Sequence, residues 1–195
     1  MFIRSERLFL RPGWPEDWEE LLPLIGDQAI VRNLSKVPWP HTGDDTGDDA
    51  RCFVNAPQDR LFPRFLVTVP GASGRAMGAR VVGGAGLNLL DGEVNLGYWI
   101  ARDHWGRGYA SEAARAVLGL ARMLGHGRIV ASHFIDNPAS GRVLEKAGFR
   151  RTGRIVERDS KGRGMACPAR EYELVFEAPS GCDDGDDAMG RKRAA

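Results

Sequence analysis

One strand-to-helix junction restricts the fold of this chain more than any other feature of its sequence. Residues 93–101 alternate in the manner of a strand, and residues 111–124 repeat apolar side chains at helical spacing. The connection between them is short and contains Gly106 and Gly108. A strand that passes so directly into an amphipathic helix belongs to a sheet with a helix packed on its face. The junction therefore predicts a protein of the α/β class.

Further strands and helices are predicted along most of the chain. Asp91-Gly92 is a strong signal for a two-residue hairpin between two strands. We expect an α/β (α+β) fold with a mixed, mostly antiparallel seven-stranded sheet and about four helices on its faces. The expected strands are residues 7–12, 65–69, 81–90, 93–101, 128–135, 149–158 and 170–176, the expected helices are residues 15–25, 111–124, 138–147 and one near the acidic repeat of residues 42–49, and residues 160–168 are expected to form a flexible loop.

The length and composition of the chain fit one intracellular domain. It has 195 residues, of which 43% are hydrophobic and 27% charged, enough to bury a core without disulfides or a structural metal. We expect residues 1–178 to form a single domain and residues 179–195, which are poor in apolar side chains, to form a disordered tail. The three cysteines lack paired spacing, and neither a signal peptide nor a long apolar stretch is recognisable. These features predict a cytoplasmic protein with no metal site and no membrane segment.

The charge of the chain is small overall but unevenly distributed. The formal net charge is +1, which disfavours nucleic acid or an anionic membrane as the main partner. Residues 102–170 nevertheless carry 14 basic and 6 acidic side chains. This excess favours a small polyanionic ligand near the junction.

The junction itself has the chemistry of an anion site. Its two glycines let the backbone approach a ligand closely, the helix N-terminus presents N–H groups, and Arg107 adds positive charge. A tight turn that binds no ligand accounts for the same residues equally well. The dinucleotide fingerprint fails because position 111 is Ser, and a Walker loop fails because Tyr109 follows Gly108. A phosphate held at this junction must be bound through another motif.

Two motifs in the chain resemble those of the GNAT family of acyl-CoA N-acyltransferases. The family's pyrophosphate motif reads Gln/Arg-x-x-Gly-x-Gly/Ala at the start of a helix, and Trp105, Gly108 and Ala110 occupy its three positions, so that only the first departs. Downstream, Asn137-Pro-Ala-Ser140 followed by VLEKAGF at residues 143–149 is similar to the family's Asn-x-x-Ser…Lys-x-Gly-Phe signature. The form of the first motif, HWGRGYASEA after LGYWI, resembles the branch that includes the ribosomal-protein N-terminal acetyltransferases.

This resemblance implies a coenzyme A site. The loop of residues 105–110 would hold the pyrophosphate, the end of the preceding strand would pair with the extended pantetheine arm, and Asn137 would hydrogen-bond that arm. Relatives often place at position 144 a Tyr that protonates the departing thiolate, whereas this chain has Leu144. The implied coenzyme-binding residues are Trp99, Ile100, Ala101, Trp105, Gly106, Arg107, Gly108, Tyr109, Ala110, Asn137 and Ser140.

The two catalytic candidates are Ser140 and Glu93. Ser140, one helical turn before Leu144, is the nearest replacement for the missing Tyr, and it also fits as an ordinary polar residue in the first turn of a helix. Glu93 lies on the strand before the junction and could act as the general base, directly or through a water. A solvated position beside the hairpin turn explains Glu93 as well. The expected oxyanion donor is a backbone N–H near Ile100.

The sequence thus predicts an acetyl-CoA-dependent N-acetyltransferase that moves the acetyl group directly to a primary amine in a ternary complex, without a metal. The alternative is a non-catalytic acyl-CoA-binding sensor on the same fold, suggested by Leu144. The loops around the acceptor are expected from residues 26–60 and 160–168. A protein N-terminus and a small amine both fit as the acceptor, and a homodimer is compatible with the sequence.

Overall fold

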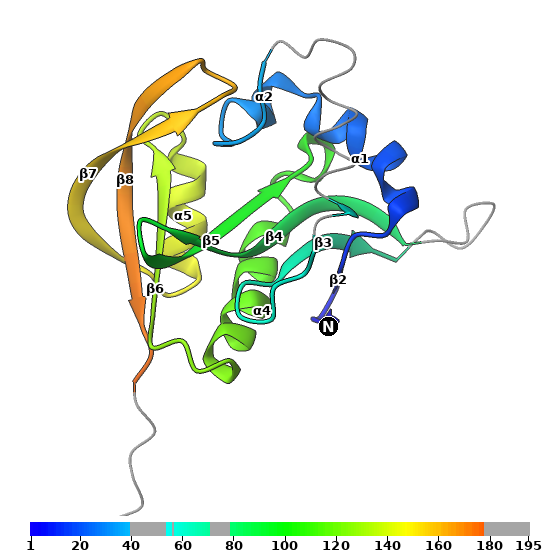
Figure 1. Cartoon of the computed structure of the whole chain (residues 1–195), viewed down its shortest axis with the longest axis horizontal. Helices are drawn as coiled ribbons and strands as arrows, with labels where there is room; N and C mark the ends of the chain where they lie inside the picture. Colours follow the sequence, from blue (N-terminus) through cyan, green and yellow to red (C-terminus); the bar gives the residue numbers. More distant parts are fainter. Residues whose placement is uncertain (40–53, 56, 71–78, 178–195) are drawn as a thin grey trace, which may run out of the picture.

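A computed structural model of the chain describes residues 1–39, 54–55, 57–70 and 79–177. Within these residues one sheet has the strand order β1-β2-β3-β4-β5-β6-β8-β7 (Figure 1). Neighbouring strands are antiparallel except β5 and β6, which are parallel. The strands are β1 Ile3–Arg4, β2 Phe9–Arg11, β3 Arg64–Val69, β4 Arg80–Leu90, β5 Glu93–Ile100, β6 Arg128–Phe134, β7 Arg150–Ser160 and β8 Met165–Val175.

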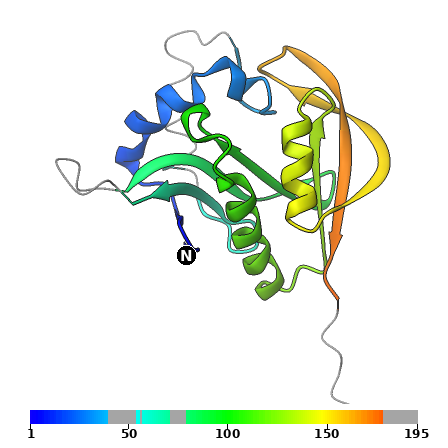
Figure 2. The same ribbon diagram turned by 180° about the vertical axis from the view of Figure 1, so that it is seen from behind.

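Helices pack on both faces of this sheet. Figure 2 shows α4 (Tyr109–Met123) and α5 (Pro138–Lys146) in front of the sheet. Phe65 and Val67 of β3 face the core beneath these helices, whereas Leu66 between them belongs to a second core with α1 (Trp18–Ile25). The alternation places the two cores on opposite faces of the sheet. The short α2 (Gln28–Val31) follows α1, and 3-10 turns η1 (Pro15–Asp17) and η2 (Arg102–His104) precede α1 and follow β5.

The predicted fold class is confirmed, with one difference in the sheet. It has eight strands among the described residues rather than seven, because β1 forms as well. This strand has only two residues, Ile3 and Arg4, and is too short for an alternating pattern to reveal it. The predicted hairpin turn is confirmed, since Asp91 (φ 52°) and Gly92 (φ 79°) link the paired β4 and β5 in left-handed conformations. The predicted helix near residues 42–49 and the predicted tail of residues 179–195 lie outside the described residues.

The predicted flexible loop at residues 160–168 was wrong. β7 continues to Ser160 and β8 already begins at Met165, so only a tight turn separates them. This turn is docked on the segment after α2: the N–H of Lys161 donates to the carbonyl of Ser35 (3.0 Å), and the Ser160 hydroxyl donates to the carbonyl of Leu34 (2.9 Å). Two segments far apart in the sequence are therefore held side by side at the ends of β5 and β6.

Candidate active site

The central feature of the site is an edge of β5 that has no partner strand among the described residues. The two parallel strands pair only at Asn95 and Val130 and then diverge. Toward its end β5 stays bonded to β4 alone, where the N–H of Ala101 donates to the carbonyl of Val82 (2.8 Å). Because the backbone groups of successive strand residues point to opposite sides, those of Ile100 face the β6 side. The sheet thus opens at the end of β5 and leaves backbone groups available to an extended ligand.

A glycine loop follows this open edge. Gly106 (φ 75°) and Gly108 (φ 79°) both have left-handed backbones, which glycine adopts without strain. The indole N–H of Trp105 donates to the carbonyl of Ile100 (2.6 Å), and this bond ties the loop to the end of β5. α4 begins at Tyr109, two residues before the predicted start, and within the described part of the chain no side chain caps its first turn. The first N–H groups of α4 are therefore available to a ligand.

The N-terminal segment braces this loop through a buried carboxylate. Glu112 in the first turn of α4 is 6% exposed and accepts hydrogen bonds from the Ser5 hydroxyl (2.7 Å) and from the backbone N–H (2.7 Å) and the Nε (2.8 Å) of Arg7. Arg7 also donates to the carbonyl of Arg107 (3.0 Å). Burial raises the pKa of Glu112, but the hydrogen bonds outweigh it and hold that pKa below its usual value. Glu112 is thus a charged, buried residue whose hydrogen bonds connect the N-terminal segment to the start of α4, next to the glycine loop.

His104 lies beside the same loop in a neutral form. Its ring is 6.2 Å from the ring of Tyr109, and its buried Nδ1 has no hydrogen-bond partner among the described residues. Burial and the nearby Arg107 lower the pKa of this imidazole below its usual value. At neutral pH His104 therefore adds no positive charge, and Arg107 is the charged side chain of the loop.

Across the open edge, α5 presents Asn137 and Ser140. The side-chain oxygen of Asn137 accepts from the backbone N–H of Ser140 (3.3 Å) and so caps the helix. The phenol of Tyr98 on β5 reaches the Ser140 hydroxyl (2.8 Å) and donates to its carbonyl (3.0 Å) or to that hydroxyl. Burial raises the pKa of Tyr98 far above its usual value, so that this phenol stays protonated. Tyr98 on β5 and Ser140 on α5 thus form a pair of hydrogen-bonded hydroxyls across the gap where β5 and β6 diverge.

The remaining inward residues of α5 belong to the core. Leu144, at the position where relatives often have Tyr, is fully buried. His133 lies beneath the helix, with its Nδ1 2.8 Å from the carbonyl of Phe134 and its ring 5.5 Å from that of Tyr172. A Cβ on Gly141 would lie 2.7 Å from His133 Nε2. His133 therefore faces the α5 side of the sheet and not the α2 side.

Comparison with known proteins identifies the family of this site. A family model described as an acetyltransferase (GNAT) domain matches residues 7–150. The chain belongs to the GNAT acetyltransferase family. It is thus an acyltransferase by family, as its sequence motifs predicted.

Several proteins are similar to this acetyltransferase over most of their length. An uncharacterised N-acetyltransferase, p20, of Bacillus licheniformis is 26% identical over 166 residues, which are 83% of this chain and 89% of the relative. A GNAT-family acetyltransferase of known crystal structure from Bacillus anthracis is 26% identical with a TM-score of 0.71, over 90% of this chain and 98% of that one. RimL, a ribosomal L7/L12 α-N-protein acetyltransferase solved with coenzyme A, is 19% identical with a TM-score of 0.70, over 90% of this chain and 98% of RimL, and shares the fold.

The structure of the GNAT domain brings together most of the residues that the sequence singled out. Those at the end of β5, in the glycine loop and at the start of α5 converge on the open edge. Glu93 is placed elsewhere, because it begins β5 at the hairpin end, seven positions before Ile100. Its carboxylate accepts a short hydrogen bond from Arg128, which also pairs with Glu173 (3.0 Å). Glu93 is therefore part of an ion-pair cluster at the far end of the strand.

Sequence reasoning missed three residues that support the GNAT site. Tyr98 lies between apolar neighbours and reads as a core residue, and Arg7 lies almost a hundred residues before the loop that it braces. Glu112 could have been noticed, because a carboxylate in the first turn of an otherwise apolar helix often has a structural partner. Among the described residues, no group of His, Cys, Asp and Glu side chains could hold a metal ion, and no helix is long and apolar enough to cross a membrane.

Proposed function

We propose that this acetyltransferase transfers an acetyl group from acetyl-CoA to a primary amine by direct attack in a ternary complex. The observation that carries the proposal is the unpaired edge of β5, which ends at a glycine loop and at an uncapped helix N-terminus. An extended chain with amide groups can add to such an edge, and a pyrophosphate suits the N–H groups that follow it. RimL, which shares the fold, was solved with coenzyme A.

The proposed coenzyme site uses the residues around this edge. Trp99, Ile100 and Ala101 would line the pantetheine arm, and Asn137 would approach it from α5. The first N–H groups of α4 and the side chain of Arg107 would bind the pyrophosphate. The residues of this loop in the proposal are Trp105, Gly106, Arg107, Gly108, Tyr109 and Ala110. Arg7 holds the loop in place because it donates hydrogen bonds both to Glu112 and to the carbonyl of Arg107.

The proposed chemistry needs one oxyanion donor and one proton donor. The nitrogen of the neutral amine forms a bond to the thioester carbon, and the backbone N–H of Ile100, which faces the opening, would stabilise the oxygen anion. When the carbon–sulfur bond breaks, the Ser140 hydroxyl, positioned by Tyr98, would give its proton to the thiolate and recover one from water. The proton released by the amine passes to solvent, so that Glu93 has no role in this scheme.

Release of free coenzyme A thiol tests the proposal directly. The chain is incubated with acetyl-CoA and with a panel of amines and peptide N-termini, while binding of acetyl-CoA is measured by calorimetry. We expect thiol release with at least one acceptor, and we expect Ser140→Ala to lower turnover while binding of acetyl-CoA is retained. Tight binding of acetyl-CoA with no thiol release on any acceptor would overturn the proposal and favour the sensor.

A further inference from the structure

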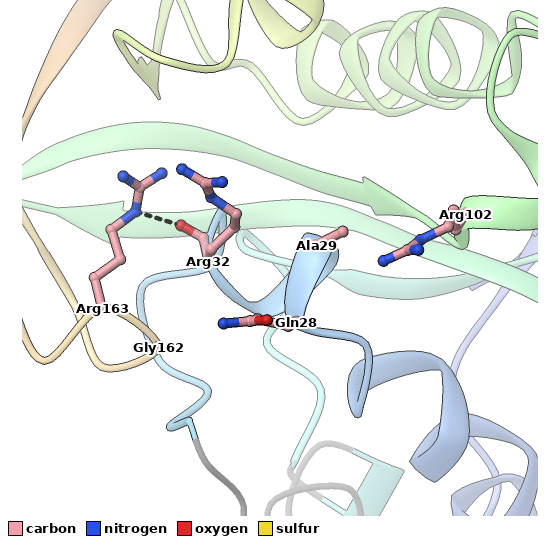
Figure 3. A pocket seen from close by; sticks show the side chains of 6 residues that line it. All are labelled: Gln28, Ala29, Arg32, Arg102, Gly162 and Arg163. Atoms are coloured by element: carbon pink, nitrogen blue, oxygen red, sulfur yellow. Dashed lines mark hydrogen bonds between the residues drawn. The ribbon is translucent and has the colours of Figure 1, made fainter.

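A pocket of about 430 Å³ lies where α2, the β7–β8 turn and the end of β5 meet (Figure 3). This volume is in the range of sites for small molecules. Figure 3 shows Arg32 and Arg163 side by side, with Arg102 reaching toward α2 from the other side. The described residues that line the pocket are Gln28, Ala29 and Arg32 from α2 and its end, Arg102 from η2, and Gly162 and Arg163 from the turn.

The charged residues of this lining are all arginines. Two carboxylates pair with them: Asp136 with Arg32 (2.6 Å) and Arg163 (2.9 Å), and Asp27 with Arg102 (2.5 Å). Neither carboxylate is among the lining residues. Among the described residues, three guanidinium groups thus pair with two carboxylates, an excess of one positive charge.

One of the three arginines is fixed in the wall. Arg163 is 16% exposed, donates two hydrogen bonds to Asp136 (2.9 Å each) and one to the carbonyl of Arg32 (2.6 Å), and lies over the ring of Phe134. Its hydrogen bonds hold the pKa of Asp136 below the usual value, so this carboxylate remains charged. Arg163 therefore forms a fixed part of the pocket wall and supplies a constant positive electrostatic potential.

The other two arginines can bind a ligand. The side chains of Arg32 and Arg102 are 51% and 56% exposed, and each is joined to one carboxylate oxygen. A guanidinium carries five N–H donors, so most of those on Arg32 and Arg102 are available. Exposed ion pairs of this kind contribute little stability, and opening or sharing them costs little. A carboxylate or phosphate matches their planar donor geometry.

The pocket adjoins the proposed transfer site. Arg102 comes two residues after Ile100, whose backbone faces the diverging strands, and Asp136 immediately precedes Asn137 at the start of α5. The pocket is lined by α2 and lies next to the end of β5, whereas Tyr98 contacts Ser140 on α5. An amine at the end of β5 would bring its own substituents into this pocket.

We propose that the pocket binds a carboxylate or phosphate group carried by the acceptor, so that the acceptor is a small anionic amine. This inference rests on the proposed function for the identity of the bound amine, while the anion site itself depends only on the arginines. Arg32 and Arg102 would grip the anionic group, and the amine would extend toward Ile100. Neutral or cationic amines lack that anchor and would bind weakly.

Pairs of acceptors that differ only in charge test this inference. Phosphoethanolamine is compared with ethanolamine, and amino acids with their carboxamides, at equal concentrations of the free-base amine. We expect kcat/KM for thiol release to be at least about tenfold higher for the anionic member of one of these pairs. The pair that responds distinguishes phosphate from carboxylate. Equal values in both pairs, or a preference for the neutral members, would overturn the inference while the proposed function stands.

Variants locate the effect in the pocket. Arg32→Ala and Arg102→Ala should each lower the ratio of anionic to neutral kcat/KM toward one, mainly through KM of the anionic amine. Arg122→Ala, at an exposed position on α4, is the matched control and should keep the ratio. An unchanged ratio in both pocket variants, or a peptide with acidic N-terminal residues that outcompetes every small amine, would also overturn the inference.

A binding measurement separates this inference from the proposed function. Inorganic phosphate is titrated into the full chain with and without coenzyme A, and binding is followed by calorimetry and by NMR of arginine side chains. We expect phosphate to bind in the presence of coenzyme A, and Arg32→Ala and Arg102→Ala to weaken this binding at least about fivefold. If no amine of either kind is acetylated but this binding persists, the proposed function fails and the anion site stands. If no such binding occurs, the anion site fails.

Discussion

At the scale of single residues, the contact between Tyr98 and Ser140 links the two sides of the open edge. Leu144 is packed in the core, and a phenol nevertheless reaches the start of α5 from the neighbouring strand. Its raised pKa keeps it a neutral hydrogen-bond donor at neutral pH. We therefore assign Tyr98 as a positioning residue that holds the Ser140 hydroxyl in one orientation.

Tyr98→Phe tests this assignment. The change removes one hydroxyl and keeps the ring in the core, so we expect kcat to fall about threefold to tenfold, which corresponds to the loss of roughly one hydrogen bond. KM for acetyl-CoA should change little. Because Tyr98 acts through Ser140, the double variant Tyr98→Phe/Ser140→Ala should be no slower than Ser140→Ala alone. Additive effects in steady-state kinetics would contradict the assignment.

Glu112 supports the glycine loop from within the protein. Its replacement by Ala leaves the backbone N–H of Arg7 without this acceptor, and the Ser5 hydroxyl keeps only its longer contact with the carbonyl of Leu8 (3.3 Å). We expect Glu112→Ala to lower the free energy of unfolding by about 2 kcal/mol and to weaken binding of acetyl-CoA, because the loop loses its brace. Urea denaturation and calorimetry measure the two effects. Glu19→Ala, at an exposed position on α1, is the control and should change the free energy of unfolding by less than about 0.5 kcal/mol. Equal losses in both variants would contradict the role of Glu112 in holding the loop.

At the scale of elements, the start of α4 is shaped by conformations that glycine adopts easily. Gly108 is left-handed, and a Cβ there would lie 3.5 Å from the guanidinium of Arg7. Gly108→Val should therefore distort the loop and raise the Kd of acetyl-CoA by at least about tenfold. Gly127→Ala, where a Cβ meets no atom of the described residues within 4 Å, is the control and should leave this Kd unchanged. Normal affinity in a folded Gly108→Val protein would remove the loop from the coenzyme site.

The close packing of α5 against the sheet depends on Gly141. A Cβ there would come within 2.7 Å of His133 and 2.9 Å of the Tyr172 hydroxyl, so Gly141→Ala must displace the helix or these rings. We expect it to lower the free energy of unfolding by about 1–3 kcal/mol. Gly119→Ala is the matched change on α4, where a Cβ meets no atom in the described part of the chain within 4 Å, and it should stabilise the protein by about 0.5–1 kcal/mol. Thermal unfolding that moves in the same direction for both variants would contradict this account of α5.

Local patterns in the sequence predicted most elements, and long-range contacts explain what they missed. The hairpin at Asp91-Gly92 and the helix that Pro138 opens carry their own signals over a few residues. The turn after Ser160 carries glycines and reads as flexible, yet its order comes from Leu34 and Ser35, more than a hundred residues earlier. The same holds for the site, since motifs located the glycine loop, whereas the contact of Tyr98 with Ser140 depends on where β5 and β6 diverge.

At the scale of the whole molecule, the arginines join distant segments through carboxylates. Arg7 ties the N-terminal segment to α4 through Glu112, and Arg32 and Arg163 tie α2 and the β7–β8 turn to Asp136 after β6. These links lie on either side of the open edge of β5. They make the shape of the site depend on the charge of a few carboxylates, and so on pH.

The signs of these pKa shifts predict how stability depends on pH. The pKa values of Glu112 and Asp136 are lower in the folded protein than in the unfolded chain, so their contribution is complete above about pH 5 and is lost as pH falls through the folded values. His104 also has a lowered pKa, so its protonation favours the unfolded chain as pH falls below about 6.5.

We therefore expect the free energy of unfolding to be constant near pH 8, to begin to decline as pH falls below about 6.5 because of His104, and to decline more steeply below about pH 5 because of the carboxylates. Urea titrations at these pH values measure the curve. His104→Gln should flatten only the upper decline, and Glu112→Gln with Asp136→Asn should flatten only the lower one at the cost of stability at neutral pH. A variant that shifts the whole curve without changing its slope in the assigned window would show that other groups carry the dependence.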